Sequence, residues 1–373
     1  MFRLDSEYTK AKTAIDKKNI LIISHDSLLG GATIALLNAA CSLRDYGYEV
    51  VWLCECEGDM LSELERYDIS YIVDPTFRGD SFWLKYASNF DLVICNTVSL
   101  APQVEMLKNS GKKVVWWVHE ASDYYVNESL NALTKANVEN LYCFCVGIIA
   151  KRNFEAKFTY LHAENMLYGM PDYATGIEDI RNVFSKADSR TIFLSIGTIE
   201  KRKGQDILTK AIRKIPSNIM DKCFFAFVGK PIDRDIYSTV TDLCKDYPNN
   251  VIWHEPVDRN TVMRMYKQAD VVLCSSREDP MPVFVTEAMM QSKAIICSEN
   301  TGSAGVLSDG IDALIYSNND PTILSEKIIQ LVSEKDLASR IGREARHTYE
   351  KHFSMEMFHD KFVSAIKRVL EEK

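Results

Sequence analysis

Apolar runs of strand length alternate with helical segments along most of the chain. In the first half such runs cover residues 19–25, 49–55, 91–96 and 112–120, and residues 32–48 between the first two have the composition of a helix. Because the runs are apolar at nearly every position, they predict strands that are buried on both faces. Strands of this kind, separated by helices, indicate a parallel sheet with helices on both sides.

The same pattern starts again after residue 170. Five further apolar runs predict a second parallel sheet, at residues 191–197, 224–229, 251–255, 270–275 and 294–298. The segments QDILTKAIRKI and TVMRMYKQA between them have the spacing of helices. The sequence therefore predicts an α/β protein with two Rossmann-like domains, whose parallel sheets face each other across a cleft. Ligands are expected in that cleft, at the carboxyl ends of the strands.

This pattern divides the chain into two domains and a final helix. Gly169 and Pro171 mark the expected join between the domains, because both residues interrupt regular structure. We place the first domain at residues 1–170 and the second at residues 171–352. The remaining residues, 353–373, have the apolar spacing of one long helix.

Composition narrows the class of protein. The chain has 373 residues, of which 46% are hydrophobic and 26% are charged, as expected for a globular protein of about two domains. The N-terminal stretch MFRLDSEYTK carries Asp5 and Glu7 where a signal peptide would be basic and then apolar, so it does not resemble one. No apolar run reaches the ~18 residues of a membrane span. Ten cysteines without a CxxC pair favour a reduced cytoplasm and no zinc site. The net charge of −8 argues against nucleic-acid binding.

The segment SREDPMPVFVTEAM, residues 276–289, leads from two prolines into an apolar run of helical length. Proline is favoured at the first position of a helix because no main-chain donor is lost there. We therefore expect a helix that begins at Pro282 and runs to about Gln291. Its first amides, those of Val283 and Phe284, would offer an anion site at the positive end of the helix dipole.

Two carboxylates flank this expected anion site. Asp279 lies in the loop before the helix, and Glu287 lies roughly 7 Å along the helix axis. Amides for phosphate and carboxylates for hydroxyl groups suit a nucleotide sugar. The plainer alternative is a strand–loop–helix joint with solvated acids, which this segment alone supports about equally well, since acids stabilise a helix N-terminus.

The same residues resemble a known signature. Asp279 and Glu287 stand eight positions apart, and Glu287 opens the tripeptide Glu-Ala-Met. This is similar to the signature of the large retaining family of GT-B glycosyltransferases, family four in the usual classification, and the resemblance extends over nearly the whole chain. It implies that Glu287 holds the ribose hydroxyls and that Asp279 lies near the donor sugar. Where the family commonly has glycine this chain has Pro282, which shifts anion binding to Val283.

A basic turn follows the first strand of the second half, in SIGTIEKRKGQD, residues 195–206. By resemblance, Lys203 and Arg202 grip the donor diphosphate, and Gly197 and Thr198 line the same turn. A Lys point charge and an Arg fork would stabilise the charge that grows on a diphosphate leaving group. Many family members have arginine where this chain has Thr198. The alternative reading is a solvated basic turn.

Signals in the first half are weaker. SHDSLLGGAT lacks the GxGxxG fingerprint of dinucleotide binding, but Gly30 and Gly31 resemble the glycine-rich loop that approaches the donor phosphate. His119 ends an apolar strand, where family members commonly direct a histidine at the donor sugar or acceptor; a structural role is the alternative. His25 and Asp26 end another strand and are acceptor candidates.

We interpret the sequence as a retaining GT-B glycosyltransferase, a hexosyl- or deoxyhexosyltransferase that moves a sugar from a nucleoside diphosphate, uridine or thymidine, to a hydroxyl of a glycan or lipid-linked glycan in polysaccharide biosynthesis. The resemblance implies no metal and no cofactor. The catalytic candidates are His119, Asp279, Lys203 and Arg202. The donor-binding candidates are Gly30, Gly31, Gly197, Thr198, Arg202, Lys203, Asp279, Met281, Pro282, Val283, Phe284 and Glu287.

Each predicted segment receives a role from this interpretation. Residues 1–170 would take the acceptor, residues 171–352 the nucleotide sugar, and the helix 353–373 would cross back to the first domain. We expect a cytoplasmic protein that does not bind nucleic acid, with peripheral contact to the inner face of the membrane left open. Two alternatives remain: a non-catalytic glycosyltransferase-like partner subunit, and a nucleotide-sugar epimerase of the same architecture.

Overall fold

The structure is a computed structural model that describes residues 18–79, 81–174, 183–317, 319–334 and 336–372. Its described residues form two compact units. The first contains those of Met1–Trp117, Asn127–Cys143 and His359–Lys373, and the second those of Val118–Val126 and Phe144–Phe358. The domain boundaries that the sequence suggests stay a prediction.

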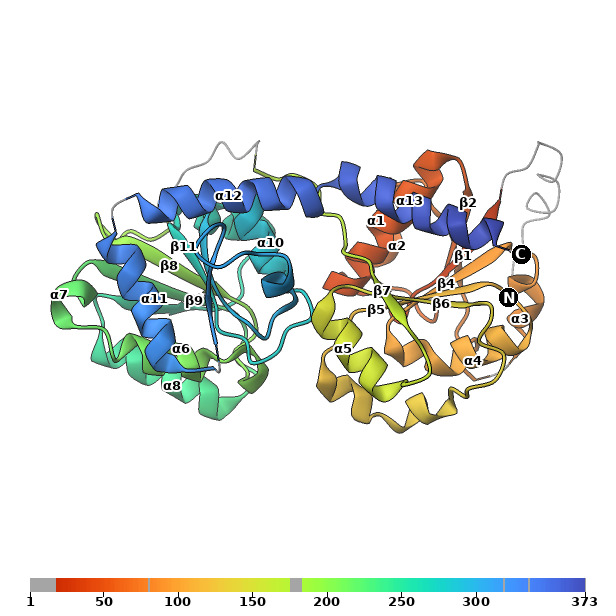
Figure 1. Ribbon diagram of the computed structural model, residues 1–373, viewed down its shortest axis with the longest axis horizontal. Coiled ribbons are helices and arrows are strands. Elements are labelled where there is room, and N and C mark those ends of the chain that lie inside the picture. The colour runs from red at the N-terminus through yellow and green to blue at the C-terminus, as the bar shows by residue number, and fades with distance from the viewer. Residues whose placement is uncertain (1–17, 80, 175–182, 318, 335, 373) are drawn as a thin grey trace. The chain divides into compact units, whose positions relative to one another are not determined.

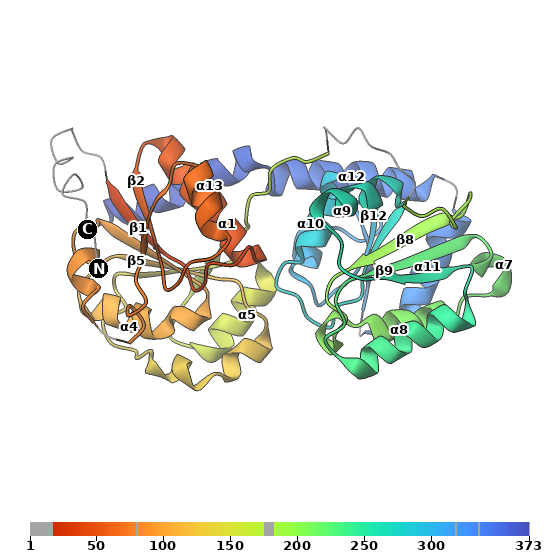
Figure 2. The same cartoon turned by 180° about the vertical axis from the view of Figure 1, so that it is seen from behind.

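A seven-stranded sheet has the strand order β3-β2-β1-β4-β5-β6-β7 (Figure 1). The pairs β1–β2, β1–β4, β2–β3 and β4–β5 are all parallel. Helix α1 covers one face of this sheet and α4 the other in both Figure 1 and Figure 2. The strands are β1 (Asn19–Ile23), β2 (Glu49–Cys54), β3 (Ser70–Val73), β4 (Leu92–Asn96), β5 (Val114–Val118), β6 (Leu141–Cys145) and β7 (Ala163–Asn165).

Five α-helices and three short 3-10 helices accompany this sheet. They are α1 (Gly31–Tyr46), α2 (Met60–Arg66), α3 (Leu84–Ala87), α4 (Ala101–Asn109), α5 (Ile148–Lys157), η1 (Val98–Leu100), η2 (Ser122–Val126) and η3 (Glu128–Ala132).

A six-stranded sheet has the order β10-β9-β8-β11-β12-β13, and its neighbouring strands pair in parallel. Helices α6 and α8 cover one face, and α9 and α12 cover the other (Figures 1 and 2). The strands are β8 (Thr191–Ile196), β9 (Cys223–Val228), β10 (Val251–His254), β11 (Val271–Cys274), β12 (Ala294–Ser298) and β13 (Leu314–Tyr316).

The helices of this half complete the fold class that the sequence predicts, two parallel-sheet Rossmann-like halves. They are η4 (Lys201–Lys203), α6 (Gln205–Ile212), α7 (Ser217–Met220), α8 (Arg234–Asp246), α9 (Arg259–Gln268), α10 (Val283–Met290), η5 (Gly302–Gly305), α11 (Pro321–Ser333) and α12 (Leu337–His352). The final helix, α13 (Met355–Glu371), begins in this half and continues in the first unit.

Most of the apolar runs form strands that are buried on both faces, as predicted, whereas the edge strand β10 is fully buried only at Val251. Trp116 and Trp117 are neighbours on β5 and point to opposite faces of the sheet, yet both are fully buried. The sequence missed β3, β6, β7 and β13, because their three to five residues are too few to give a clear periodicity. One boundary was wrong by a residue: Pro282 caps α10 with extended backbone, and the helix begins at Val283.

The part of α13 from His359 onward belongs to the first unit. Phe362 is fully buried and its ring lies 5.3 Å from the ring of Trp117. The ammonium of Lys113 donates hydrogen bonds to the carbonyl oxygens of Val369 (2.8 Å) and Leu370 (3.1 Å). These carbonyls have no partner inside the helix, so Lys113 satisfies the end of α13.

Replacing Phe362 with alanine should therefore destabilise the first unit by about 3–5 kcal/mol, since the change removes a buried ring and leaves a cavity. Chemical denaturation followed by circular dichroism measures this. Phe82→Ala is the matched control, because Phe82 belongs to the same unit and is 64% exposed; its cost should stay within about 1 kcal/mol. Equal costs for both variants would contradict the packing of α13.

Candidate active site

The basic turn and the loop before α10 meet through one ion pair. The ammonium of Lys203, at the end of η4, lies 2.5 Å from a carboxylate oxygen of Asp279. The guanidinium of Arg202 lies 3.6 Å from the same oxygen. Lys203 also lies 5.8 Å from the centre of the Phe284 ring in the first turn of α10. The two segments, about 76 residues apart in the sequence, therefore form one site at the carboxyl edge of the six-stranded sheet.

The two signature acids are buried. Asp279 is 5% exposed and Glu287 is 3% exposed, so the alternative of solvated acids was wrong for this segment. The main chain of Asp279 is held from both sides by the loop after β12. Its N–H donates to Asn300 O (3.2 Å), and its carbonyl oxygen accepts from Gly302 N (2.8 Å). This loop therefore fixes the backbone of Asp279.

The N-terminus of α10 presents main-chain donors. Pro282 caps the helix at φ −67°, and its carbonyl oxygen accepts from Val285 N at 3.0 Å. Among the described residues no protein acceptor is hydrogen-bonded to the N–H groups of Val283 and Phe284. These donors, beside the Lys203 ammonium, make the positive helix end suited to an anion. Met281 and Pro282, predicted in the same site, are buried beneath this turn.

Glu287 has two protein partners that the sequence did not reveal. Tyr266, on α9, donates its hydroxyl to one carboxylate oxygen at 2.8 Å, and Arg259 at the start of α9 pairs with the other. Burial raises the pKa of Tyr266 well above that of an ordinary phenol, and the Glu287 charge adds to the rise, so Tyr266 stays a neutral donor. Each carboxylate oxygen accepts more than one hydrogen bond, which leaves capacity for ligand hydroxyls.

Thr198 and Gly197 lie at the basic turn, where the structure shows their contacts with other protein groups. The Thr198 hydroxyl donates to Glu200 at 2.8 Å, and Glu200 pairs with Arg202 at 3.0 Å. A side chain at Gly197 would stand 3.8 Å from Lys203 Cε. The cations Arg202 and Lys203 are therefore paired with the carboxylates of Glu200 and Asp279, so that two positive charges face two negative charges. Glu200 was not among the predicted site residues.

Glu278, next to Asp279, contacts a different part of the second unit. Its carboxylate accepts a hydrogen bond from the main-chain N–H of Ser122 at 3.0 Å. It also accepts from the Ser122 hydroxyl and from the amide of Asn153 on α5. Asp279, by contrast, faces Lys203.

Three of the predicted site residues belong to the N-terminal half of the sequence. Gly30 caps α1, and Gly31 is its first residue, both in the first unit. His119 follows β5, and its main-chain N–H donates to the Glu120 carboxylate at 2.9 Å. The roles of these residues stay predictions.

His25 and Asp26, the acceptor candidates, form a pair. The ring Nε2 of His25 lies 3.1 Å from the Asp26 carboxylate, and Arg78, which the sequence did not single out, donates to the carbonyl oxygen of His25 at 2.6 Å. Burial lowers the pKa of His25, the Asp26 charge opposes this, and the Arg78 charge lowers it further. Arg78 also pairs with Glu55 at 2.8 Å. The ends of β1 and β2 thus carry a charged cluster.

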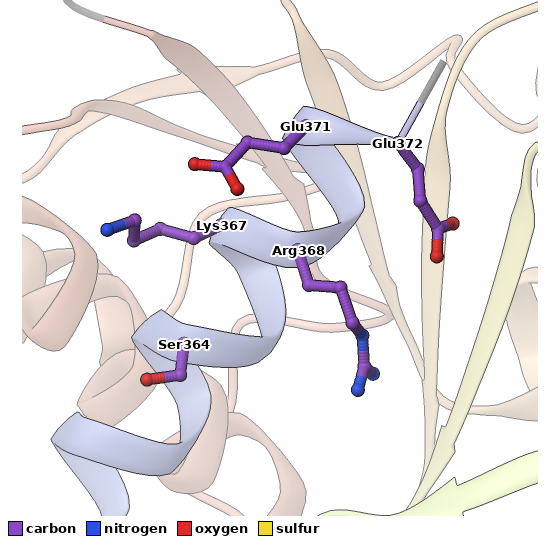
Figure 3. A pocket seen from close by; sticks show the side chains of 5 residues that line it. All are labelled: Ser364, Lys367, Arg368, Glu371 and Glu372. Atoms are coloured by element: carbon purple, nitrogen blue, oxygen red, sulfur yellow. The ribbon is translucent and has the colours of Figure 1, made fainter.

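A hollow of about 440 Å³ lies on the last turns of α13 (Figure 3). Two cationic and two acidic side chains line it together with a serine: Ser364, Lys367, Arg368, Glu371 and Glu372. It contains none of the candidate residues, and we assign it no ligand. Within the described ranges no three His, Cys, Asp or Glu side chains gather as a metal site, and no helix has the length and apolar composition to cross a membrane.

Two family models match this chain. "Glycosyl-transferase family 4" matches residues 16–144, and "Glycosyl transferases group 1" matches residues 176–348. The chain belongs to the group 1 glycosyltransferases. The second match contains the basic turn, Asp279 and Glu287, which are the residues that form the ion-pair site.

Known glycosyltransferases are similar to this chain over different shares of its length. An uncharacterized glycosyltransferase of Methanocaldococcus jannaschii is 27% identical over 48% of this chain and 47% of that protein. The alpha-1,3/1,6-mannosyltransferase ALG2 of mouse is 20% identical over 97% of this chain and 99% of that protein. This chain spans about half the length of the M. jannaschii protein and of several other curated relatives that it matches.

The fold of this group 1 glycosyltransferase is GT-B. The structure of HepE from Anabaena in complex with UDP superimposes with a TM-score of 0.76 at 15% identity, and covers 94% of this chain and 100% of HepE. The predicted fold class is thereby confirmed.

Gly204 joins the basic turn to α6 and tests the packing of the site. Its φ is +68°, and an added side chain would stand 2.1 Å from the carbonyl oxygen of Ser275. Gly204→Ala should therefore lower the free energy of unfolding by more than the roughly 1 kcal/mol that a left-handed backbone alone costs an alanine. Gly310→Ala is the control, because its φ is +78° and no atom lies within 4 Å.

Thermal and chemical unfolding of the two variants measure the difference. We expect Gly204→Ala to be the less stable of the two variants. If Gly310→Ala were destabilised as much as Gly204→Ala, the close approach of residues 204 and 275 would be wrong.

Proposed function

We propose that this chain is a retaining glycosyltransferase that moves a sugar from a nucleoside diphosphate to a hydroxyl of a glycan or lipid-linked glycan, without a metal ion. The observation that carries the proposal is the meeting of Lys203, Asp279 and the first turn of α10. Cations and unpaired amides beside buried carboxylates suit a ligand that is anionic at one end and rich in hydroxyls at the other.

The anionic end is the diphosphate. An ammonium has three donors and a guanidinium five, so Lys203 and Arg202 keep donors beyond those that Asp279 and Glu200 accept. The N–H groups of Val283 and Phe284 add fixed dipoles on the side of α10. Because these dipoles are already oriented, they stabilise a growing negative charge without reorganisation. This is the work that a metal ion performs at other diphosphate sites.

The carboxylates of Glu287 and Asp279 would bind the hydroxyl-rich parts of the donor, which are its ribose and its sugar. Glu287 is held by Tyr266 and Arg259, so it is oriented before a ligand arrives and would accept the ribose hydroxyls. Asp279 would lie close to the donor sugar while it fixes Lys203. Arg259 is half exposed at its side chain and lies over Tyr173 at 5.2 Å, which leaves room for it to yield to a nucleoside.

The transfer step needs no nucleophile from the protein. The bond between the anomeric carbon and the diphosphate oxygen breaks, and its electron pair leaves with the diphosphate. The acceptor oxygen forms its bond on the same face, and its proton passes to the leaving phosphate oxygen. Lys203 and Arg202 stabilise the charge on that leaving group, and the anomeric configuration is kept.

Related proteins indicate the substrate class. HepE is described in complex with UDP and glucose, and the mouse relative is named a mannosyltransferase. For this chain we propose a uridine donor first and a thymidine donor second. The charged cluster of His25, Asp26 and Arg78 at the ends of the first strands would bind acceptor hydroxyls. The cytoplasm, with peripheral membrane contact, remains the proposed location.

A substrate screen tests the function. Thermal shift with nucleoside diphosphates and their sugars should show stabilisation by mass action, with UDP or TDP giving the largest shift. Product formed from the best donor in the presence of EDTA should carry the donor's anomeric configuration by NMR.

Several outcomes would overturn the proposal. An inverted product removes the retaining mechanism, and loss of transfer with EDTA removes metal independence. Release of nucleotide with a 2-epimer would favour the epimerase, and glycan binding without any nucleotide binding would favour the partner subunit.

Lys203→Ala should lower turnover on the order of 10²–10³-fold, since it removes charge stabilisation of the leaving diphosphate. Initial rates with saturating donor measure this. Lys214→Ala is the control, because Lys214 is exposed in the same unit and its side chain forms no ion pair with any residue that the structure describes. Equal rates for Lys203→Ala and wild type would remove Lys203 from the mechanism.

Glu287→Gln tests the ribose assignment. Wild type should bind UDP more tightly than its 2′-deoxy analogue, because a buried carboxylate then loses a partner. In Glu287→Gln the preference should shrink about tenfold, which isothermal titration calorimetry measures with both ligands. An unchanged preference would show that Glu287 does not touch the ribose.

A further inference from the structure

The carbonyl oxygens of the three residues of η4 are all held by one neighbouring segment. Arg277 donates from its guanidinium to Lys201 O at 2.7 Å, and from its main-chain N–H to Arg202 O at 2.8 Å. The hydroxyl of Ser275 donates to Lys203 O at 3.0 Å. Three successive carbonyls of η4 are therefore bonded to residues 275–277, the stretch that follows β11.

The guanidinium of Arg277 is itself fixed by a carboxylate. Its two terminal nitrogens each lie 2.7 Å from one oxygen of Asp206, in the first turn of α6. Burial alone would raise the pKa of Asp206, but the hydrogen bonds and charge of Arg277 outweigh burial and lower it. Asp206 therefore stays ionised, and the two-pronged geometry sets the plane of the guanidinium.

This arrangement decides which part of the turn faces the ligand. A carbonyl oxygen is negative and would repel a diphosphate, whereas the Arg202 and Lys203 side chains attract it. With its carbonyls bonded toward residues 275–277, the turn presents those two side chains toward Asp279. Arg277 adds no donor to Asp279 in the structure, so its effect on the site passes through the turn.

We infer that Arg277 is a positioning residue for diphosphate recognition: by bonding the turn's carbonyls and Asp206 together, it sets Arg202 and Lys203 in place. The inference rests on the proposed function. Lysine cannot replace arginine here, because one ammonium cannot span both oxygens of Asp206 and the Lys201 carbonyl in a plane. No residue of the Asp279–Glu287 signature points to this role.

The test compares a nucleoside diphosphate with its monophosphate. UDP and UMP, or TDP and TMP if the screen favours thymidine, are titrated into wild type, Arg277→Ala, Arg277→Lys and Asp206→Asn. We expect diphosphate affinity to fall about tenfold in Arg277→Ala and Arg277→Lys, and by less in Asp206→Asn, while monophosphate affinity changes less than threefold. Arg213→Ala, which breaks the exposed pair with Asp246 in the same unit, should leave both affinities unchanged.

A second background separates positioning from a general loss of structure. In Arg202→Ala/Lys203→Ala the further change Arg277→Ala should have no effect on diphosphate affinity, since the residues through which it acts are gone. Equal losses of both nucleotides, or a full further loss in that background, would overturn the inference. If wild type binds neither diphosphate, the proposed function fails first and the inference with it. Normal binding by wild type and by Arg277→Lys would overturn the inference alone.

Discussion

The structure of the C-terminal half depends on one partly buried ion pair, between Lys203 and Asp279. Because the carboxylate of Asp279 is buried, it is stable only when its charge has a partner, so the pair commits the basic turn and the loop before α10 to the same place. The loop after β12 fixes the main chain of Asp279, and Arg277 and Ser275 fix that of the turn. The helix end, two cations and two acids are thus assembled without a ligand.

Balance of charge explains how such a site exists before the donor arrives. Arg202 and Lys203 face Glu200 and Asp279, so the protein does not carry an uncompensated cluster of cations in a partly buried turn. A diphosphate then joins the cations through their remaining donors. The same balance suits an enzyme that must release a nucleoside diphosphate after each transfer, because a fully unpaired pair of cations would hold that product more tightly.

The sequence was informative where a pattern is long or a spacing is specific. Continuous apolar runs predicted nine of the strands in type, and the eight-residue spacing of Asp279 and Glu287 located the signature. What it missed depends on tertiary contacts. Nothing in the spacing of TVMRMYKQA distinguishes Tyr266 from a core residue, and Arg259, Glu200 and Arg277 read as ordinary surface charges. Their partners lie far along the chain and only the folded sheet edge brings them together.

The most direct test is a crystal structure of this chain with its nucleoside diphosphate bound. The account predicts phosphate oxygens within hydrogen-bonding distance of the Lys203 ammonium and of the N–H of Val283 or Phe284, with Asp279 still beside Lys203. A diphosphate bound away from both Lys203 and the start of α10 would contradict it.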